Sequence, residues 1–217
     1  MKNILRTALL AALLGGTLSA TTLTYDLDPF TGSESDVQVL VDDAAVPGMI
    51  KINVDVLATP NIGDLIGFWI EFAGNTPLPL TADMFSGPHL TGVAFNTLNM
   101  GKGNVMNPSP LPAGDTFDVG LRIGRQGLVD DIRSTTVYID AASLGLDAFS
   151  FAGFGARLQS VGLEEWCFRD GSSKLFAPAS DEPHNPNQPV PEPAAFALLG
   201  AGLCGLGLWR RIRITGR

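Results

Sequence analysis

Apolar side chains occupy every second position in several segments of this chain, and this alternation constrains the fold more than any other feature. In 50–56, branched apolar residues alternate with Lys, Asn and Asp, and 66–72 and 117–123 follow the same pattern. A period of two places the apolar side chains on one face of a β-strand. Further strands are expected at 22–28, 37–41, 92–96, 135–140, 149–153 and 156–161.

These short strands, with turn residues between them and no amphipathic helix, predict an all-β fold. Strands with one apolar face pack in two antiparallel layers, so we expect an antiparallel β-sandwich of the jelly-roll or immunoglobulin-like kind. The turn at 60–64 indicates that 50–56 and 66–72 form a hairpin or a neighbouring pair. The Gly- and Pro-rich segment 99–115 is expected to be a long exposed loop, where a binding site can lie.

The start of the chain has the order of a secretory signal. A basic beginning is followed by the short apolar stretch 8–14 and by small residues up to Ala20, which predicts a signal peptide over 1–20. The apolar stretch is shorter than the ~20 residues that cross a bilayer. We therefore expect an exported domain at 21–177, followed by a Pro-rich stalk at 178–189.

The last segment of the chain, 190–217, combines a short motif, an uncharged run and a basic end. In order, these parts are Pro191, Glu192 and Pro193, the run 194–209, and Arg210, Arg211 and Arg213. The run predicts a transmembrane helix, and the arginines place its far end in the cytoplasm and the domain outside. Sixteen residues rise about 24 Å, less than a hydrocarbon core of ~30 Å. The span therefore suits transient rather than permanent anchorage.

The exported part is strongly acidic, because residues 21–190 hold eight Lys and Arg against twenty-one Asp and Glu. This charge argues against nucleic acid and anionic lipid as partners. Sixteen of these acids are Asp, which favours turns and also supplies calcium ligands. The candidate calcium ligands are Asp42, Asp43, Asp55, Asp64, Asp130 and Asp131. None lies in a spaced calcium-loop motif, so solvated turn residues are the favoured interpretation and no cofactor is expected.

Residues for catalysis are scarce. A nucleophile needs a nearby base, and of the two histidines His184 lies in the stalk and His89 in a loop. Trp69 and Trp166 could stack on sugars, although packing within the domain is the favoured role. Cys167 has no partner for an intramolecular disulfide, because the second cysteine lies in the hydrophobic tail.

The tail resembles the PEP-CTERM sorting signal of Gram-negative bacteria in the order of its three parts. The resemblance implies that an exosortase recognises Pro191, Glu192 and Pro193, while Arg210, Arg211 and Arg213 retain the chain in the membrane until it is processed. Signal peptidase and the secretion machinery are the other implied partners, and extracellular polysaccharide or biofilm is the implied setting. Segments 130–136, 154–162 and 171–175 also resemble parts of a recurrent exported domain of PEP-CTERM proteins. This resemblance implies a shared domain but no particular activity.

The sequence thus favours a non-catalytic protein of the cell surface or extracellular matrix, sorted by an exosortase. A carbohydrate-binding module, with or without calcium, is the first alternative, because acidic loops and tryptophans on a sandwich permit it. An exported hydrolase is the second alternative, and the sequence offers no nucleophile–base or metal constellation for it.

Overall fold

A computed structural model of the protein describes residues 21–74, 78–125, 129–165 and 169–178, and in them it is all-β with one short 3-10 helix. The expected all-β class is confirmed. The elements are β1 (Thr22–Gly32), β2 (Asp36–Val46), β3 (Met49–Leu57), β4 (Ile62–Phe72), η1 (Ala82–Met84), β5 (Phe85–Ser86), β6 (Leu90–Phe95), β7 (Val119–Ile123), β8 (Ser134–Asp140), β9 (Phe151–Gly162) and β10 (Gly171–Pro178).

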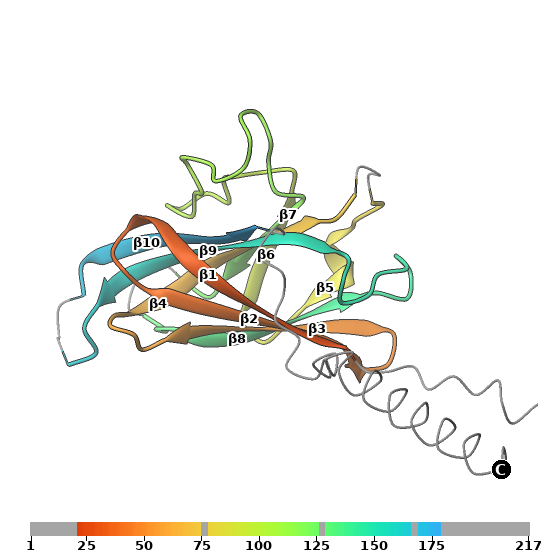
Figure 1. Ribbon diagram of the computed structural model, residues 1–217, viewed down its shortest axis with the longest axis horizontal. Coiled ribbons are helices and arrows are strands. Elements are labelled where there is room, and N and C mark those ends of the chain that lie inside the picture. Colours follow the sequence, from red (N-terminus) through yellow and green to blue (C-terminus); the bar gives the residue numbers. More distant parts are fainter. Residues whose placement is uncertain (1–20, 75–77, 126–128, 166–168, 179–217) are drawn as a thin grey trace, which may run out of the picture. The chain divides into compact units, whose positions relative to one another are not determined.

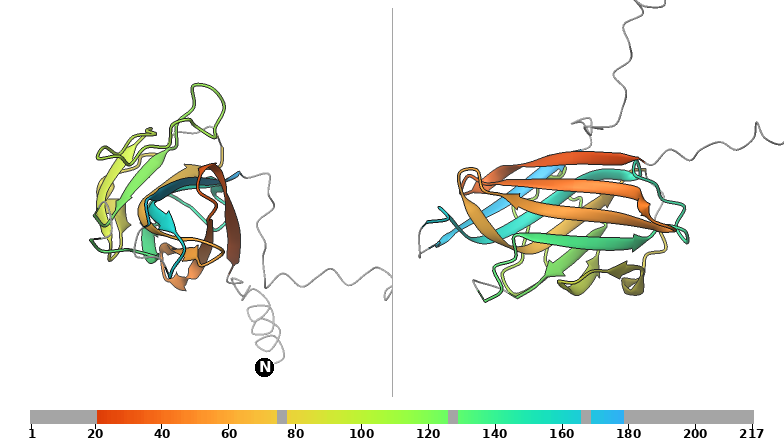
Figure 2. Two further views of the ribbon diagram at one scale, coloured as in Figure 1. Left: turned by 90° about the vertical axis from the view of Figure 1, so that its left-hand side faces the viewer. Right: turned by 90° about the horizontal axis from the view of Figure 1, so that it is seen from below.

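All strand pairs are antiparallel and join into one sheet of order β5-β8-β3-β2-β1-β10-β9-β4-β7-β6. The first half of β1 pairs with β2, and its second half pairs with β10, with a shift in register between Pro29 and Thr31. The sheet therefore bends at β1 and curls until its two halves face each other (Figure 1 and Figure 2). Two separate sandwich layers are not established, because β1 belongs to both halves.

The two edges of the sheet meet through a short connection. Edge strands β5 and β6 are joined by only Gly87, Pro88 and His89. The Phe85 and Phe95 rings from these two strands lie 6.2 Å apart. The carbonyl of His89 accepts a hydrogen bond from the Gly124 amide at the end of β7, at 2.8 Å. This connection holds one edge of the sheet close to the other.

The main core fills the space between the halves, largely with the apolar faces that the alternation predicts. In β4 the register shifts between Leu65 and Gly67, so Leu65 and not Ile66 belongs to this core. Ile50, Ile52 and Val54 of β3 are fully buried there, as are Phe68 and Ile70 of β4. The core continues through aromatic rings from β1 and β9. Apolar burial at about 25 cal/mol per Å² is the dominant favourable contribution to the stability of such a domain.

The expected pairing of 50–56 with 66–72 is wrong. β3 pairs with β2 and β8, whereas β4 pairs with β7 and β9. After the turn the chain crosses to the opposite half of the sheet, so the two apolar faces meet across the core instead of side by side. A period of two identifies the buried face of a strand, but it does not identify the neighbour.

A second, smaller core lies outside the sheet, beneath the long loop between β6 and β7. Trp69 projects from the outer face of β4 and packs with Met100, Met106 and Phe117 of that loop. Strand glycines leave room for these side chains: a Cβ at Gly120 would meet the Met100 sulfur, and one at Gly155 would meet Phe117. Segment 99–115 is thus a long loop as expected, and through Met100 and Met106 it packs on the outer face of β4.

Several expectations concern residues outside those that the structure describes. They are the signal peptide at 1–20, the stalk beyond Pro178, the transmembrane helix at 194–209 and the sorting motif, together with Trp166 and Cys167. The described ranges contain no helix with the length and apolar character that a membrane crossing requires.

Candidate functional site

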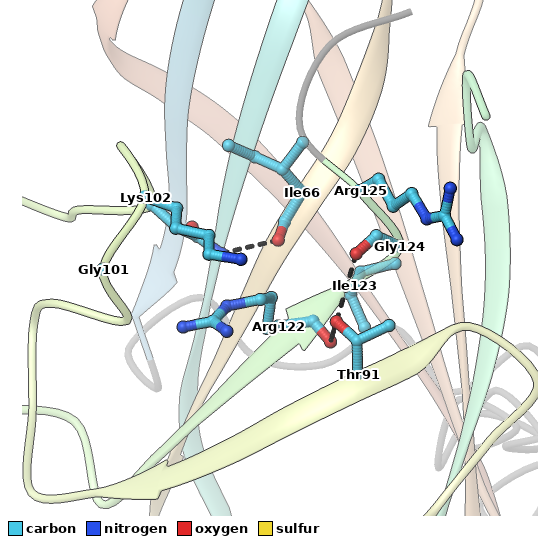
Figure 3. Close-up of a pocket in the computed structure, with 9 residues that line it drawn as sticks. Ile66, Thr91, Gly101, Lys102, Arg122, Ile123, Gly124 and Arg125 are labelled. Carbon is cyan, nitrogen blue, oxygen red and sulfur yellow. Dashed lines mark hydrogen bonds between the residues drawn. The ribbon is translucent and has the colours of Figure 1, made fainter. Parts of the chain in front are cut away.

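A pocket of about 470 Å³ opens between the long loop and the adjoining strands β4, β6 and β7. Its lining residues are Ile66, Thr91, Gly101, Lys102, Asn104, Arg122, Ile123, Gly124 and Arg125. They come from four segments that are distant in sequence (Figure 3). Three of the nine are cations, so the chemistry of the pocket differs from that of the acidic domain around it.

Lys102 lies at the tip of a tight turn that forms one wall of the pocket. Gly101, Lys102 and Gly103 have φ values of 72°, 52° and 76°, all in the left-handed region. The turn is closed by the Met100 amide, which donates to the Asn104 carbonyl at 2.9 Å, while the Asn104 amide donates to Gly101 at 3.1 Å. Glycine adopts this region freely, whereas a lysine is strained there by roughly 1–2 kcal/mol.

Asn104 anchors the turn to the sheet. Its side chain is 2% exposed, and its Nδ2 donates to the carbonyl of Ile66 in β4 at 2.5 Å. The amide packs directly over Gly67, where a Cβ would collide with it. The absence of a side chain at Gly67 therefore lets the loop approach β4 closely enough to form the pocket wall.

Arg122 extends from β7 toward the same turn and donates through Nη2 to the carbonyl of Met100. Its Nη1 makes no hydrogen bond to the residues that the structure describes. Thr91, on β6, donates its hydroxyl to the carbonyls of Arg122 and Gly124 at 3.3 and 3.1 Å. The hydroxyl oxygen can still accept a hydrogen bond from a ligand.

The charge of the pocket is concentrated at one end. In Figure 3 the Lys102 and Arg122 side chains occupy one end, while the guanidinium of Arg125 extends away at the other. None of the three forms an ion pair within the described ranges. Asp130 lies at the Arg125 end, where its carboxylate accepts a hydrogen bond from the Arg125 backbone amide at 2.7 Å. The Lys102–Arg122 end is therefore the part best able to attract an anion.

A second cluster of charges has the opposite character, because its cations are matched by acids. Arg169, whose side chain is 6% exposed, donates to Asp131. Arg133 donates to Asp131 at 3.2 Å and to Glu164 at 2.6 Å. We call Asp131, Arg133, Glu164 and Arg169 the paired cluster.

Asp64 is fully buried beside the paired cluster. Its Oδ1 accepts the Ile132 amide at 2.9 Å, and its Oδ2 has no partner among the described residues. Burial raises the pKa of this carboxyl to about 7, against the lowering effect of the Ile132 amide and with some help from the charges of Asp130 and Asp131. The Leu65 amide donates to Ile132 in return at 2.8 Å, so Asp64 ties this segment to β4.

The other acids considered as calcium ligands are engaged in turns and caps. Asp42 accepts the amides of Ala44 and Ala45 at 2.9 and 2.8 Å. Asp43 accepts the amides of Thr21 and Ala148, and Asp55 accepts the Ser134 hydroxyl. Among the described residues there is no group of three or more His, Cys, Asp or Glu side chains placed to hold a metal ion.

The two remaining candidates from the sequence, His89 and Trp69, lie in contacts that hold the fold together. The His89 ring lies 3.2 Å from the hydroxyl of Thr135, at the connection between the sheet edges. Trp69 is fully buried in the outer core, so it offers no exposed face for sugar stacking.

The pocket cations were missed by sequence reasoning, although a weak signal for them exists. Lys102, Arg122 and Arg125 are three of only eight cations in 21–190, and they lie in the expected loop, in the strand that follows it and just beyond that strand. Nothing in the spacing of residues 66, 91, 102 and 122 indicates that they meet. Only the pairing of β4, β6 and β7 brings them together.

Comparison with known families identifies the end of the chain. Residues 189–211 match the family described as the PEP-CTERM protein-sorting motif. The chain therefore carries a PEP-CTERM sorting motif, which implies processing by an exosortase and export to the cell surface or beyond. Comparisons with curated proteins and with solved structures give no match for this chain.

Proposed function

We propose that this protein is a non-catalytic component of the cell surface or extracellular matrix, delivered there by an exosortase and associated with extracellular polysaccharide or biofilm. The observation that carries the proposal is the sorting motif at 189–211. The strongly acidic exported part fits a protein that remains dispersed outside the cell, because like charges keep molecules apart.

The tail supplies the delivery step of this proposal. Pro191, Glu192 and Pro193 serve as the recognition residues, and Arg210, Arg211 and Arg213 resist passage through the membrane. A charge at the bilayer centre costs about 2.5–3.5 kcal/mol on insertion scales. The chain is thus held at the membrane only until the exosortase processes it.

Two tail variants test this division of roles in a host that has an exosortase. Replacing Pro191 and Glu192 together by Ala should block processing and leave an uncleaved chain in the membrane fraction. Replacing Arg210, Arg211 and Arg213 together by Ser should release some uncleaved chain instead. Intact-mass measurement of both fractions distinguishes the products. If the Pro191/Glu192 variant were trimmed to the wild-type mass, the motif would have no role in processing.

A structural role for His89 supports the non-catalytic assignment. The ring lies against the Thr135 hydroxyl at the junction of the two sheet edges, and the His89 carbonyl accepts the Gly124 amide. We expect His89→Gln to lower the stability of the fold, and we expect neither the wild type nor this variant to hydrolyse polysaccharide or ester substrates. Hydrolysis of polysaccharide or ester substrates by the wild type, lost in this variant, would favour an exported hydrolase.

Carbohydrate binding is the second candidate function, and the pocket is the observation that favours it. A concave site with a few converging polar groups is the usual form of a ligand site. A glycan array probed with the exported protein, with and without EDTA, tests the candidate and its calcium-assisted form together. Glycan binding that EDTA abolishes would indicate that calcium held by the acidic loops takes part. Glycan binding that EDTA leaves unchanged would favour binding by the pocket cations.

A further inference from the structure

We propose that the pocket binds carboxylate groups of an acidic polysaccharide, with Lys102 and Arg122 receiving the anion. The inference rests on the proposed extracellular function and names the class of ligand. It starts from the uneven distribution of charge, because three of eight cations in an acidic exported part line one pocket.

The pocket cations are available for a ligand because no acid among the described residues forms an ion pair with them. The salt bridges among the described residues belong to the paired cluster, and none involves Lys102, Arg122 or Arg125. Arg122 uses Nη2 on the Met100 carbonyl, which fixes its guanidinium at the pocket wall. A preorganised guanidinium loses little entropy when it binds a carboxylate.

The backbone conformation of Lys102 is a second, independent observation that supports a ligand site. Its φ of 52° is unfavourable for lysine, and Asn or Gly would adopt the same turn at lower cost. The lysine is exposed, and its ammonium has no ion-pair partner among the described residues that would offset this strain. Strained residues cluster at ligand sites, where the strain serves to place a side chain.

The rest of the lining suits a sugar better than a phosphate polymer. The Thr91 hydroxyl and the Gly124 carbonyl can accept hydrogen bonds from sugar hydroxyls, and Ile123 offers an apolar surface beside them. Asp130 beside Arg125 opposes anions at that end, which confines the carboxylate to Lys102 and Arg122.

Polygalacturonate is the probe for this inference, applied to the protein as its native host exports it. We expect binding that weakens with salt, and at least about tenfold weaker binding of the fully methyl-esterified polymer, because a hydrogen bond to a charged group is lost. Equal binding of the esterified polymer would overturn the proposal. Binding of inorganic phosphate as tight as that of the polymer would also overturn it, since the site would then take any small anion.

The matched variants are Lys102→Asn and Lys51→Asn, which change the net charge equally. Lys51 lies on β3, outside the pocket. We expect Lys102→Asn to weaken polygalacturonate binding about tenfold and Lys51→Asn to leave it unchanged. Arg125→Gln should have a smaller effect than Lys102→Asn. Equal effects of the two lysine variants would overturn the site, because only net charge would then matter.

Failure of this inference is separable from failure of the proposed function. If the exported protein cofractionates with extracellular polysaccharide but does not bind polygalacturonate, the ligand assignment falls and the matrix role stands. If a Lys102→Asn variant is exported and processed normally but no longer binds polygalacturonate, the matrix role and the ligand assignment both stand. If the wild type binds polygalacturonate but is absent from the matrix fraction, the function fails and the pocket assignment stands.

Discussion

The cations of the paired cluster and those of the pocket lie in the same acidic domain, but only the cations of the paired cluster form salt bridges with acids of the described residues. In the paired cluster, Arg169 is almost fully buried against Asp131, and Arg133 is held by two acids. In the pocket, Lys102 and Arg122 face a cavity, and no acid among the described residues pairs with them. A buried cation must be matched by an anion of the protein, whereas an exposed one can be left for a ligand.

The largest effect is expected at Asp131, which holds both arginines of the paired cluster. Asp131→Asn keeps a side chain that tolerates the φ of 40° at this position but removes the charge. Arg169 is then buried without a counterion, so the free energy of unfolding should fall by about 2–3 kcal/mol. Urea unfolding measures the change. If the free energy of unfolding fell by less than about 0.5 kcal/mol, the paired cluster would contribute no more than ordinary surface ion pairs do.

Asp64 should make stability depend on pH. Its pKa in the folded state is about 7, above the ordinary value of 3.8, so the folded state retains a proton that the unfolded state releases. Its stabilising contribution is complete below about pH 4 and is lost as pH rises through about 7. Asp64→Asn should remove this dependence. Parallel unfolding free energies of the two proteins from about pH 4 to about pH 8 would contradict a raised pKa.

On the pocket side, Gly67→Ala should destabilise the protein by about 1–2 kcal/mol, because the new Cβ displaces the Asn104 amide. Asn104→Ala alone should cost about 1 kcal/mol through its lost hydrogen bond to Ile66. The double variant should be less destabilised than the sum of the two, since the collision has been removed. Strict additivity in urea unfolding would mean that the loop does not rest on Gly67.

The smallest effect on stability is expected at Lys102. Lys102→Asn should leave the free energy of unfolding unchanged or raise it by up to about 1 kcal/mol, because Asn adopts the left-handed region more readily. A stable variant with lost ligand binding would sharpen the contrast with Asp131, whose loss damages the fold. A marked destabilisation, measured by thermal unfolding, would give Lys102 a structural role instead.

Much of the strand content could be predicted from the sequence, because alternation is a local property. The buried positions of β3 and β7 follow it directly. The partners of β3 could not be predicted in full, since β8 lies far along the chain. The sequence favours packing of Trp69 within the domain, and the residue is buried, but the sequence does not indicate that the loop from β6 to β7 supplies the contacts.

The sequence by itself determined the sorting motif, the acidic character of the exported part and the alternation that forms its strands, because each is encoded in adjacent residues. The tertiary structure alone decided where the two kinds of cation lie. Arg169 meets Asp131, and Lys102 and Arg122 come to line one pocket, only after the sheet has curled and the loop has closed over Gly67. Charge pairing acts over a few ångströms in space, and linear spacing does not set that distance.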